Sequence, residues 1–310
     1  MDRRCREDNA IRVALEPKPR AEVDIDASLA RALLREQHPD LADLSLTQIG
    51  EGWDNTLFRL GSDLVVRLPR RAVAAVLVEH EQRWLPTLAS RLPLPIPLPV
   101  RIGIAGCGYP WPWSVVPWFA GECALVQPPL DLSSAAPDLG AFLRTLHRPA
   151  PADVPANPWR ASLESRTSVM VERLQRIDGI VDGAAVAALW ERVLATPSWP
   201  GPPLWIHADL HPGNLVVHDR RVSAVIDFGD LTSGDPATDL SVAWMLFPPG
   251  LRPNFREAAR NTFNAVDDDT WMRARGWALT LGVAYLAYSH DDEAMGVLGK
   301  ATIIAALEGM

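Results

Sequence analysis

The chain has 310 residues, of which 48% are hydrophobic and 22% charged, and its formal net charge is −8. This composition is typical of a soluble globular protein and excludes an intrinsically disordered chain. The acidic balance leaves no general basic surface for a phosphate backbone, so nucleic acid is not an expected partner and a cationic small molecule is favoured. At this length we expect two lobes or domains that meet at a cleft.

The three cysteines, Cys5, Cys107 and Cys123, are odd in number and widely spaced. They fit neither a disulfide framework nor a zinc cluster, so a reducing compartment is expected. The N-terminal sequence is charged where a signal peptide needs an apolar run, and the longest apolar stretch, near 277–288, is too short to span a bilayer. These features predict a cytoplasmic protein with no membrane partner.

The first predicted elements belong to a small N-lobe over residues 23–120. Residues 1–22, which are rich in charge, are expected to form a loosely ordered extension. An amphipathic helix follows Asp26, its predicted N-cap, and ends before Pro39. Residues 45–71 contain short β-type runs separated by turns, which predict an antiparallel meander.

A helix predicted over 76–92 stops before a proline-rich extended run, and a buried strand over 113–121 then closes the N-lobe near Gly121. The remaining residues, 121–310, form a C-lobe with a mainly helical pattern. Its helices are predicted at 135–148, 162–177, 184–195 and from Asp239 onward. Short β-like runs interrupt them at 203–210 and 214–230.

Two motifs in the C-lobe carry the candidate chemistry: HADLHPGN at 207–214 and IDFGD at 226–230. The apolar runs between them are joined by a turn, and the resulting hairpin would bring Asp209, Asn214 and Asp227 to one end of two strands. One side-chain amide and one carboxylate suit Mg²⁺ that arrives with nucleotide phosphates. Asp209 is then free to orient an acceptor hydroxyl and to take its proton during phosphoryl transfer.

The pattern HxDxxxxN followed by IDFGD resembles the catalytic and metal-binding loops of the aminoglycoside phosphotransferase family, which includes related macrolide kinases. The resemblance covers most of the chain from about Asp24 to the segment GDPATDL. It implies an α+β, two-lobed protein-kinase-like fold, with a small antiparallel-sheet N-lobe, a mainly helical C-lobe and the nucleotide between them. It also implies a role for each motif residue: Asp209 as catalytic base, Asn214 and Asp227 as Mg²⁺ ligands, Asp239 as the buried carboxylate that fixes the catalytic loop, and His207 as a residue that braces this loop.

In that family the small lobe supplies a cation for the nucleotide phosphates and a helix carboxylate that holds it. Arg67 and Glu81 occupy those places, although the family usually has lysine where Arg67 stands. Arginine is not a neutral replacement for lysine, but some kinases that resemble this chain, macrolide kinases among them, also carry it in an RxPRR context. The alternatives are that Arg67 is a surface strand residue and that Glu79 is the partner; Glu81 is favoured for its spacing to Leu85.

The purine is expected at the end of the N-lobe. Pro117, Trp118 and Phe119 fall where a kinase-like hinge presents backbone groups to the base. Val66 and Ile226 would sandwich the ring, with generic core packing as the alternative for this apolar pair. The segment GEGWDN lacks the full glycine-rich pattern, so it is either a phosphate-binding loop or an ordinary hairpin turn.

Together these features predict an enzyme that transfers the γ-phosphoryl group of ATP or GTP, with Mg²⁺, to a hydroxyl of a small molecule. An aminoglycoside antibiotic is the favoured acceptor, because acidic clusters at 267–269 and 291–293 would attract a polycation, although such clusters often are solvated helix ends. A macrolide, or a metabolite such as choline, homoserine or an amino sugar, is the alternative acceptor. A catalytically silent nucleotide-binding protein is the second alternative, because of Arg67. The sequence does not decide between ATP and GTP as the donor, or between a monomer and a homodimer. The role of His211 is also open: it is either structural or part of the polar network of the site.

Overall fold

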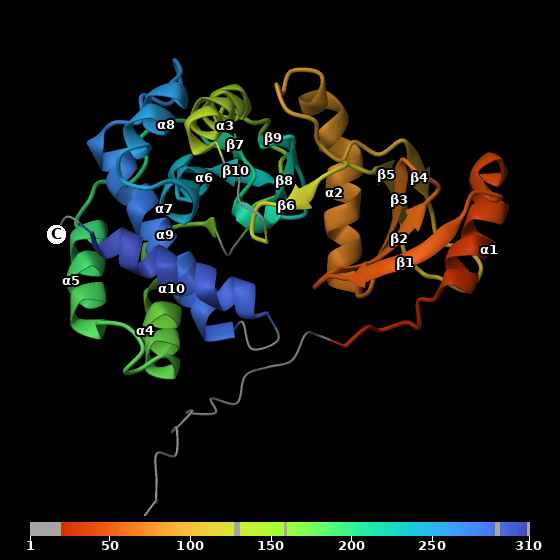
Figure 1. Cartoon of the computed structure of the whole chain (residues 1–310), viewed down its shortest axis with the longest axis horizontal. Coiled ribbons are helices and arrows are strands. Elements are labelled where there is room, and N and C mark those ends of the chain that lie inside the picture. Colours follow the sequence, from red (N-terminus) through yellow and green to blue (C-terminus); the bar gives the residue numbers. More distant parts are fainter. Residues whose placement is uncertain (1–19, 127–130, 158–159, 289–291, 309–310) are drawn as a thin grey trace, which may run out of the picture.

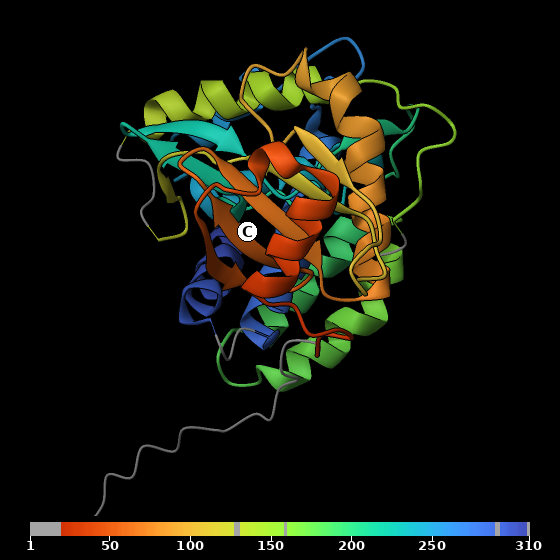
Figure 2. The ribbon, with the colours of Figure 1, turned by 90° about the vertical axis from the view of Figure 1, so that its right-hand side faces the viewer.

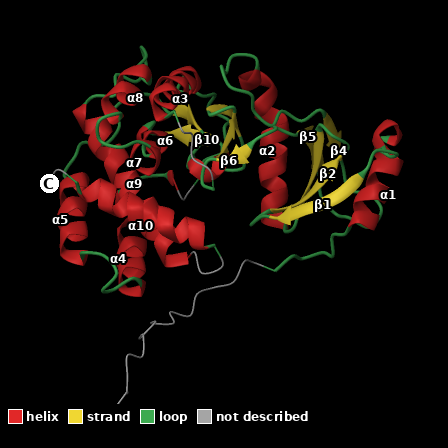
Figure 3. Cartoon of the chain, viewed as in Figure 1, coloured by secondary structure: helices red, strands yellow, loops and turns green. Residues whose placement is uncertain are grey.

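The computed structural model describes residues 20–126, 131–157, 160–288 and 292–308, which form two lobes (Figure 1). The N-lobe combines one antiparallel sheet with two helices, and helices dominate the C-lobe (Figure 3), so the predicted two-lobed α+β architecture is confirmed. Most of the predicted N-terminal extension lies outside the described residues. At its end, the N–H of Glu22 donates to the carbonyl oxygen of Arg70 at 2.8 Å, which ties this part of the chain to the N-lobe.

The N-lobe is a five-stranded antiparallel sheet with a helix on each face (Figures 1 and 2). In the order β1-β2-β3-β5-β4, its strands are β1 (Leu46–Glu51), β2 (Asn55–Leu60), β3 (Leu64–Pro69), β5 (Trp113–Pro117) and β4 (Arg101–Gly103). Helix α1 (Ala27–Gln37) begins after Asp26, whose side chain accepts a hydrogen bond from the N–H of Leu29 as the predicted N-cap. A short 3₁₀ turn (Pro39–Leu41) follows α1, and helix α2 (Ala72–Ala89) covers the other face.

Helix α2 contributes to both lobes. It begins at Ala72 rather than at residue 76, because the side chain of Glu22 accepts a hydrogen bond from the N–H of Ala72 at 3.0 Å. This cap comes from a distant part of the chain and leaves no local sequence signal. Toward the end of α2, Leu85 and Leu88 pack in the core of the C-lobe, so the middle of this helix, which carries Glu81, is fixed from both sides.

The C-lobe consists of helices around two small sheets. Its helices are α3 (Leu132–Leu146), α4 (Thr167–Arg176), α5 (Gly183–Leu194), α6 (Ala237–Leu240), α7 (Val242–Leu246), α8 (Arg252–Ala258), α9 (Asp268–Tyr288) and α10 (Glu293–Leu307), with 3₁₀ turns at Glu164–Arg166 and Pro212–Asn214. One sheet has the order β6-β8-β9, and its strands are β6 (Glu122–Cys123), β8 (Leu215–His218) and β9 (Arg221–Val225). The other pairs β7 (Leu204–Ile206) with β10 (Thr232–Gly234). Strands β4, β6 and β10 were not predicted, because two or three residues carry no measurable alternation.

The chain passes between the lobes at Gly121. This residue has a φ of 131°, and a Cβ atom there would lie 2.2 Å from the carbonyl oxygen of Val217. Both constraints require glycine. Directly afterwards, Glu122 and Cys123 pair with β8 and join the C-lobe sheet. No helix in the described ranges is both long and apolar enough to cross a membrane.

Candidate active site

The loop between β7 and β8, residues 207–214, is held in place by Asp239. The Oδ2 atom of Asp239 accepts a hydrogen bond from the N–H of His207 at 2.9 Å, and Oδ1 accepts one from the N–H of Ala208 at 2.8 Å. Asp239 is fully buried. Ala208 has a φ of 70°, in the left-handed region that costs a residue with a side chain about 1–2 kcal/mol. The buried carboxylate therefore holds a strained turn of the backbone.

A histidine that the sequence analysis missed, His147, completes the contacts of Asp239. Its Nε2 lies 3.1 Å from Asp239 Oδ2, and its Nδ1 lies 3.4 Å from Nδ2 of Asn264. The amide of Asn264 is oriented by the N–H of Val266, which donates to its Oδ1. Nδ2 therefore donates to Nδ1 of His147, and Nε2 carries the proton that His147 donates to Asp239.

The side chain of His207 links the loop to the end of β9. Its Nε2 lies 3.0 Å from the carbonyl oxygen of Ile226, and its Nδ1 lies 3.3 Å from the N–H of Asp209. The ring is buried and packs on Phe228, with 4.5 Å between ring centroids. His207 thus braces the loop, which is the role that the family resemblance implied.

Asp209, Asn214 and Asp227 meet at one end of the β8–β9 hairpin. Nδ2 of Asn214 donates to the carbonyl oxygen of Asp209 at 2.8 Å and lies 3.4 Å from its Oδ2. The carbonyl oxygen of Asn214 accepts a hydrogen bond from the N–H of Ile226 at 2.9 Å, and Asp227 follows with a φ of 62°. Because its amide nitrogen is engaged by Asp209, Asn214 keeps Oδ1 for another partner.

Oδ1 of Asn214 and the carboxylate of Asp227 form a donor set for a hard divalent cation. The side chain of Asp227 is 59% exposed and therefore accessible to a ligand. Among the residues that the structure describes, no three His, Cys, Asp or Glu side chains gather into a metal site of their own. An ion such as Mg²⁺, which keeps waters and takes ligands from nucleotide phosphates, fits such an incomplete pair.

The carboxylate of Asp209 faces positive charge. Nη2 of Arg160 lies 3.2 Å from its Oδ1, and Nε2 of His211 lies 3.6 Å from its Oδ2. Burial alone would raise the pKa of Asp209, but the charges of His211 and Arg160 outweigh it and hold the pKa well below its usual range. Asp209 is therefore ionised at neutral pH. His211 contacts this network and also accepts a hydrogen bond from the N–H of Gly213 at 3.0 Å.

Arg160 is a second residue that the sequence analysis missed, since it lies in a loop without a motif. Its Nε donates to the carbonyl oxygen of Ala208, and its Nη2 lies 3.8 Å from Oδ2 of Asp230. Burial, together with the charge of Asp209, raises the pKa of Asp230 to about 6. Arg160 therefore stands between two carboxylates whose pKa values are shifted in opposite directions.

Arg67 and Glu81 form a buried ion pair. Nη1 of Arg67 lies 2.9 Å from Oε1 of Glu81, and the two residues are 8% and 2% exposed. Nη2 of Arg67 lies 4.0 Å from Oδ1 of Asp227. Burial alone would lower the pKa of Arg67, but the charges of Glu81 and Asp227 raise it. Glu81, the favoured partner of Arg67, is thus the observed partner. Glu79, the alternative, is exposed on the surface of α2.

The neighbouring arginines hold the turn between β1 and β2. Nη1 of Arg70 donates to the carbonyl oxygen of Gly52 at 3.0 Å, and Nη2 of Arg71 lies 2.7 Å from Oδ1 of Asp54. Arg70 and Arg71 therefore bind the turn through their side chains. The segment GEGWDN forms a hairpin turn, and Gly52, Trp53 and Asp54 line the cleft between the lobes.

The cleft between the lobes has a volume of about 380 Å³. The residues predicted for the nucleotide that line it are Arg67, Pro117, Trp118, Phe119, Ile226 and Asp227. At the hinge, the N–H of Trp118 donates to the carbonyl oxygen of Asp63 at 2.7 Å, and the guanidinium of Arg59 lies 4.0 Å from the centre of the Trp118 ring. The N-lobe therefore fixes the hinge through both the backbone and the side chain of Trp118.

The prediction for Val66 is wrong. Val66 is fully buried in the core of the N-lobe, and Val65 lines the cleft in its place. Side chains alternate between the two faces of a strand, so Val65 and Arg67 share one face of β3. A cleft position for Arg67 therefore excludes Val66.

A second cavity, of about 250 Å³, adjoins Asp209. Its wall is formed by the loop that carries Arg160, by α4 and by α9. The ionisable side chains that line it are Arg160, Arg166, Arg173, Asp209, Asp230 and Tyr285. Among the described residues, three of these six ionisable side chains are arginines.

The described members of the acidic clusters on which a cationic acceptor was predicted do not line this cavity. Oδ1 of Asp267 accepts a hydrogen bond from the N–H of Thr270 at 2.8 Å, at the start of α9. Asp292 caps α10 in the same way through the N–H of Met295. Asp291 lies outside the described residues. The described members are solvated helix ends, which was the alternative interpretation, so they do not support a polycationic acceptor.

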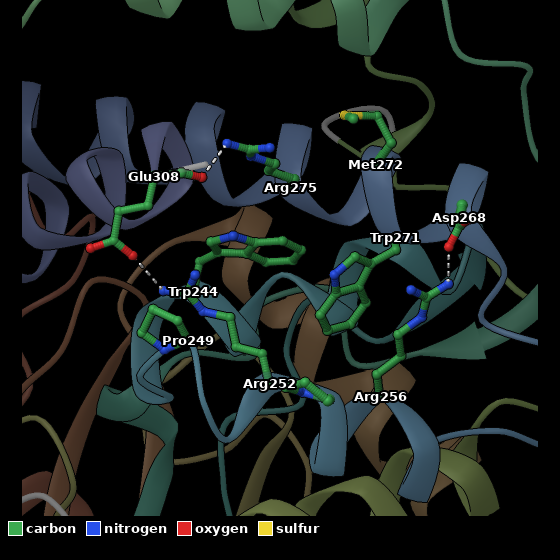
Figure 4. Close-up of a pocket in the computed structure, with 10 residues that line it drawn as sticks. Trp244, Pro249, Arg252, Arg256, Asp268, Trp271, Met272, Arg275 and Glu308 are labelled. Carbon is green, nitrogen blue, oxygen red and sulfur yellow. Dashed lines mark hydrogen bonds and ion pairs between the residues drawn. The ribbon is translucent and has the colours of Figure 1, made fainter. Parts of the chain in front are cut away.

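Figure 4 shows a further cavity, of about 450 Å³, formed by α7, α8, α9 and the end of α10. Its arginines are engaged in holding these elements together. Arg275 donates to the carbonyl oxygen of Glu308 at 2.7 Å, and Arg252 lies 3.5 Å from the carboxylate of the same residue. Arg256 pairs with Asp268 at 2.7 Å. None of the residues predicted for the active site lines this cavity.

A model of the phosphotransferase enzyme family matches residues 45–277. Among solved structures, the GDP complex of aminoglycoside 2'-phosphotransferase-IIIa is similar with a TM-score of 0.69 and 20% identity, covering 90% of this chain and 97% of that chain. The gentamicin complex of APH(2")-IIa gives a TM-score of 0.60 and 18% identity, covering 92% and 99%. Macrolide 2'-phosphotransferase MphH from Brachybacterium faecium gives 0.57 and 20%, covering 89% and 97%.

These similarities confirm the predicted protein-kinase-like fold. No curated protein matches the chain. Because the family model matches well over half of its residues, the chain belongs to the phosphotransferase enzyme family, and the protein is a phosphotransferase.

Proposed function

We propose that this protein transfers the γ-phosphoryl group of ATP or GTP to a hydroxyl of a small molecule, with Mg²⁺. The supporting observation is the position of Asn214. Its backbone binds the strand end that leads to Asp227, which lines the interlobe cleft, and its amide binds Asp209, which lines the adjoining cavity. One hydrogen-bonded unit therefore connects a cleft for the phosphoryl donor with a cavity for the acceptor.

The donor nucleotide binds in the interlobe cleft. Arg67, held by Glu81, provides a fixed positive charge for the nucleotide phosphates. The N–H groups of successive residues in an extended segment point to opposite sides. Because the N–H of Trp118 points toward Asp63, directly before β3, the carbonyl oxygen of Pro117 and the N–H of Phe119 are the hinge groups for the purine edge.

Oδ1 of Asn214 and the carboxylate of Asp227 would hold Mg²⁺, which neutralises charge on the transferred and leaving phosphates. Asp209 accepts a hydrogen bond from the acceptor hydroxyl and orients it. The acceptor oxygen then bonds to the γ-phosphorus, and the bond to the bridging oxygen breaks with its electron pair on the nucleoside diphosphate. The hydroxyl proton passes to Asp209, which is ionised at neutral pH and therefore able to accept it.

The acceptor class follows from the chemistry of the family more than from any one relative. Solved proteins of this fold include a kanamycin complex and a macrolide 2'-phosphotransferase. Kanamycin and macrolides are both small molecules, which supports a small-molecule acceptor here. ATP and GTP are both retained as donors, since solved complexes of this fold contain GDP or ATP.

The test is nucleotide turnover by the purified protein, with ATP and GTP in parallel, against aminoglycosides, macrolides and hydroxylated metabolites. We expect one acceptor class to stimulate turnover only with Mg²⁺. Asp209→Asn is expected to lower this turnover by about 10²–10⁴-fold while nucleotide binding persists. The matched control is Asp219→Asn, at the exposed turn of the β8–β9 hairpin. Stimulated turnover that survives in Asp209→Asn would exclude Asp209 as the base.

A further inference from the structure

A small cavity, of about 180 Å³, lies where the end of α2 meets the C-lobe. Its wall on α2 is formed by Trp84, Thr87 and Leu88, which share one face of the helix because they are three and four residues apart. The rest of the wall comes from the end of α3, the proline-containing segment after it and Trp205 of β7. None of its lining residues lines the interlobe cleft or the cavity beside the proposed base.

The interior of this cavity is apolar. Leu88 and Leu146 are buried, and the rings of Trp84 and Trp205 meet edge to face with 5.3 Å between their centroids. An apolar cavity of roughly 150 Å³ accommodates a benzene ring. This cavity therefore has room for one aromatic ring or a short alkyl chain.

The unpaired polar side chains of the cavity are all hydrogen-bond donors. The hydroxyls of Thr87 and Thr145 already donate to carbonyl oxygens of their own helices. The other polar side-chain groups are N–H groups, which belong to the two tryptophans and to Arg91 and Arg148. In the described part of the chain, Nε1 of Trp84 is buried without a hydrogen-bond partner, which is an unfavourable state for a donor.

Positive charge in this cavity has no carboxylate opposite it. Arg91 and Arg148 are exposed, so their guanidinium groups lie on the solvent side of the cavity. No described Asp or Glu lines the cavity, and within the described ranges neither arginine has an ion-pair partner. Asp153, which lies close by in the chain, is paired with Arg83. An anion would therefore be attracted to this opening and a cation repelled.

We propose that the cavity binds a small organic acid, with an apolar body among Trp84, Leu88 and Trp205 and a carboxylate that accepts hydrogen bonds from Arg91 and Arg148. Guanidinium and carboxylate form strong, charge-assisted hydrogen bonds. A carboxylate has about four lone-pair sites, enough for both arginines and the indole N–H of Trp84. Because this site is separate from the donor cleft and the acceptor cavity, its ligand is neither substrate of the proposed reaction.

The test uses four probes that separate the apolar body from the charge. Phenylacetate has both, phenylacetamide is its neutral isostere, phenethylamine is cationic and acetate lacks the apolar body. Binding to the full chain is followed by ¹H–¹⁵N NMR of the indole groups, and the Trp84 resonance is identified by its loss in Trp84→Phe. We expect phenylacetate to shift this resonance saturably and to bind at least about fivefold more tightly than the other three probes, a difference of about 1 kcal/mol.

Variants assign the carboxylate to the arginines. In the double variant Arg91→Gln, Arg148→Gln, the preference for phenylacetate over phenylacetamide is expected to disappear, because both charges are gone. Arg192→Gln, which removes an exposed charge from α5, is the matched control and should keep the preference. In the unaltered protein the preference should fall as salt is raised, a readout that requires no variant to fold.

A competition experiment with nucleotide and Mg²⁺ locates the bound acid. We expect no displacement, since the two sites share no lining residue. Displacement by nucleotide, equal binding of phenylacetate and phenylacetamide, or no saturable shift at Trp84 would each overturn the inference, as would a preference that survives in the double variant. None of these readouts involves turnover, so the inference and the proposed phosphoryl transfer fail or stand separately.

Discussion

The N–H of Ala208 donates to the buried carboxylate of Asp239 at 2.8 Å, from a backbone conformation with a φ of 70°. Asp209 directly follows Ala208 in the chain, so this bond helps to set the direction of the proposed base. The same carboxylate accepts hydrogen bonds from the N–H of His207 and from His147. The active-site loop is therefore oriented by a residue that lies in the core and does not line the cavity beside Asp209.

Asp239→Asn tests this arrangement. The variant places an amide N–H₂ against donors that now bind a carboxylate, so one of them is left unpaired. We expect the free energy of unfolding to fall by about 2–3 kcal/mol, measured by urea denaturation, and turnover to fall as well. Asp267→Asn is the control, because asparagine replaces aspartate well where the side chain only caps the start of α9. Equal stability losses in the two variants would show that Asp239 has no special structural role.

The pairing of Arg67 leads to a second prediction. Glu81→Gln leaves the buried guanidinium without its carboxylate, so Arg67 is free to turn away from the nucleotide phosphates. We expect the KM for nucleotide to rise by about tenfold or more, which corresponds to about 1.4 kcal/mol. Glu79→Gln, at the exposed position on the same helix, is expected to leave this KM unchanged. Steady-state kinetics measures both, and the reverse pattern would make Glu79 the partner.

Much of the fold follows from local sequence patterns. Helices α1, α3 and α5 carry apolar residues at helical spacing, and each begins after an aspartate whose side chain caps it. The meander of β1 to β3 follows from its turns. The start of α2 was misplaced because its cap, Glu22, comes from a distant segment. Strands β4, β6 and β10 have only two or three residues and depend on a neighbouring strand for their pairing, so no local pattern indicates them.

The candidate site likewise contains residues that local sequence patterns predict and residues that only tertiary contacts bring in. The residues of the two motifs were predictable because a single hairpin joins them. His147 and Arg160 reach the site from segments 92 and 49 residues away from their partners, so only the assembled C-lobe brings them there. The error at Val66 was of another kind. Strand alternation already excluded Val66 once Arg67 had been assigned to the cleft.

A third prediction concerns the carboxyl group of Asp230, whose pKa is raised to about 6 from 3.8. Below the unfolded pKa, a carboxyl group whose pKa is raised in the folded state is protonated in both states and does not change stability. As the pH rises from the unfolded pKa through the folded pKa, the unfolded state ionises first and folding stability is lost. In protein freed of Mg²⁺ with a chelator, the unfolding free energy relative to Asp230→Asn should therefore fall between about pH 4 and pH 6. Urea denaturation across this range measures it, with the exposed Asp43→Asn as control. A difference independent of pH would contradict the shifted pKa.

A fourth prediction concerns the turn that borders the nucleotide cleft. Arg71 holds Asp54 at 2.7 Å, and this turn contributes to the lining of the cleft. In Arg71→Gln the turn loses this restraint, so we expect nucleotide binding to weaken by about fivefold, equivalent to about 1 kcal/mol, with little change in kcat. Titration with a fluorescent nucleotide measures the affinity. Arg91→Gln, an exposed residue just beyond α2, is the control and should bind nucleotide normally.

The last prediction concerns the crossing between the lobes at Gly121. Gly121→Ala places a Cβ 2.2 Å from the carbonyl oxygen of Val217 on a backbone with a φ of 131°. Since the obstacle is backbone of β8, the connection between the lobes must shift, at a cost of about 2–3 kcal/mol, and the hinge beside Phe119 must shift with it. We expect lower thermal stability together with weaker nucleotide binding. Gly183→Ala is the matched control, because a Cβ at the start of α5 meets nothing within 4 Å and alanine favours the helix by up to about 1 kcal/mol. If both variants unfold at the temperature of the unaltered protein, the close approach at Gly121 does not constrain the connection between the lobes.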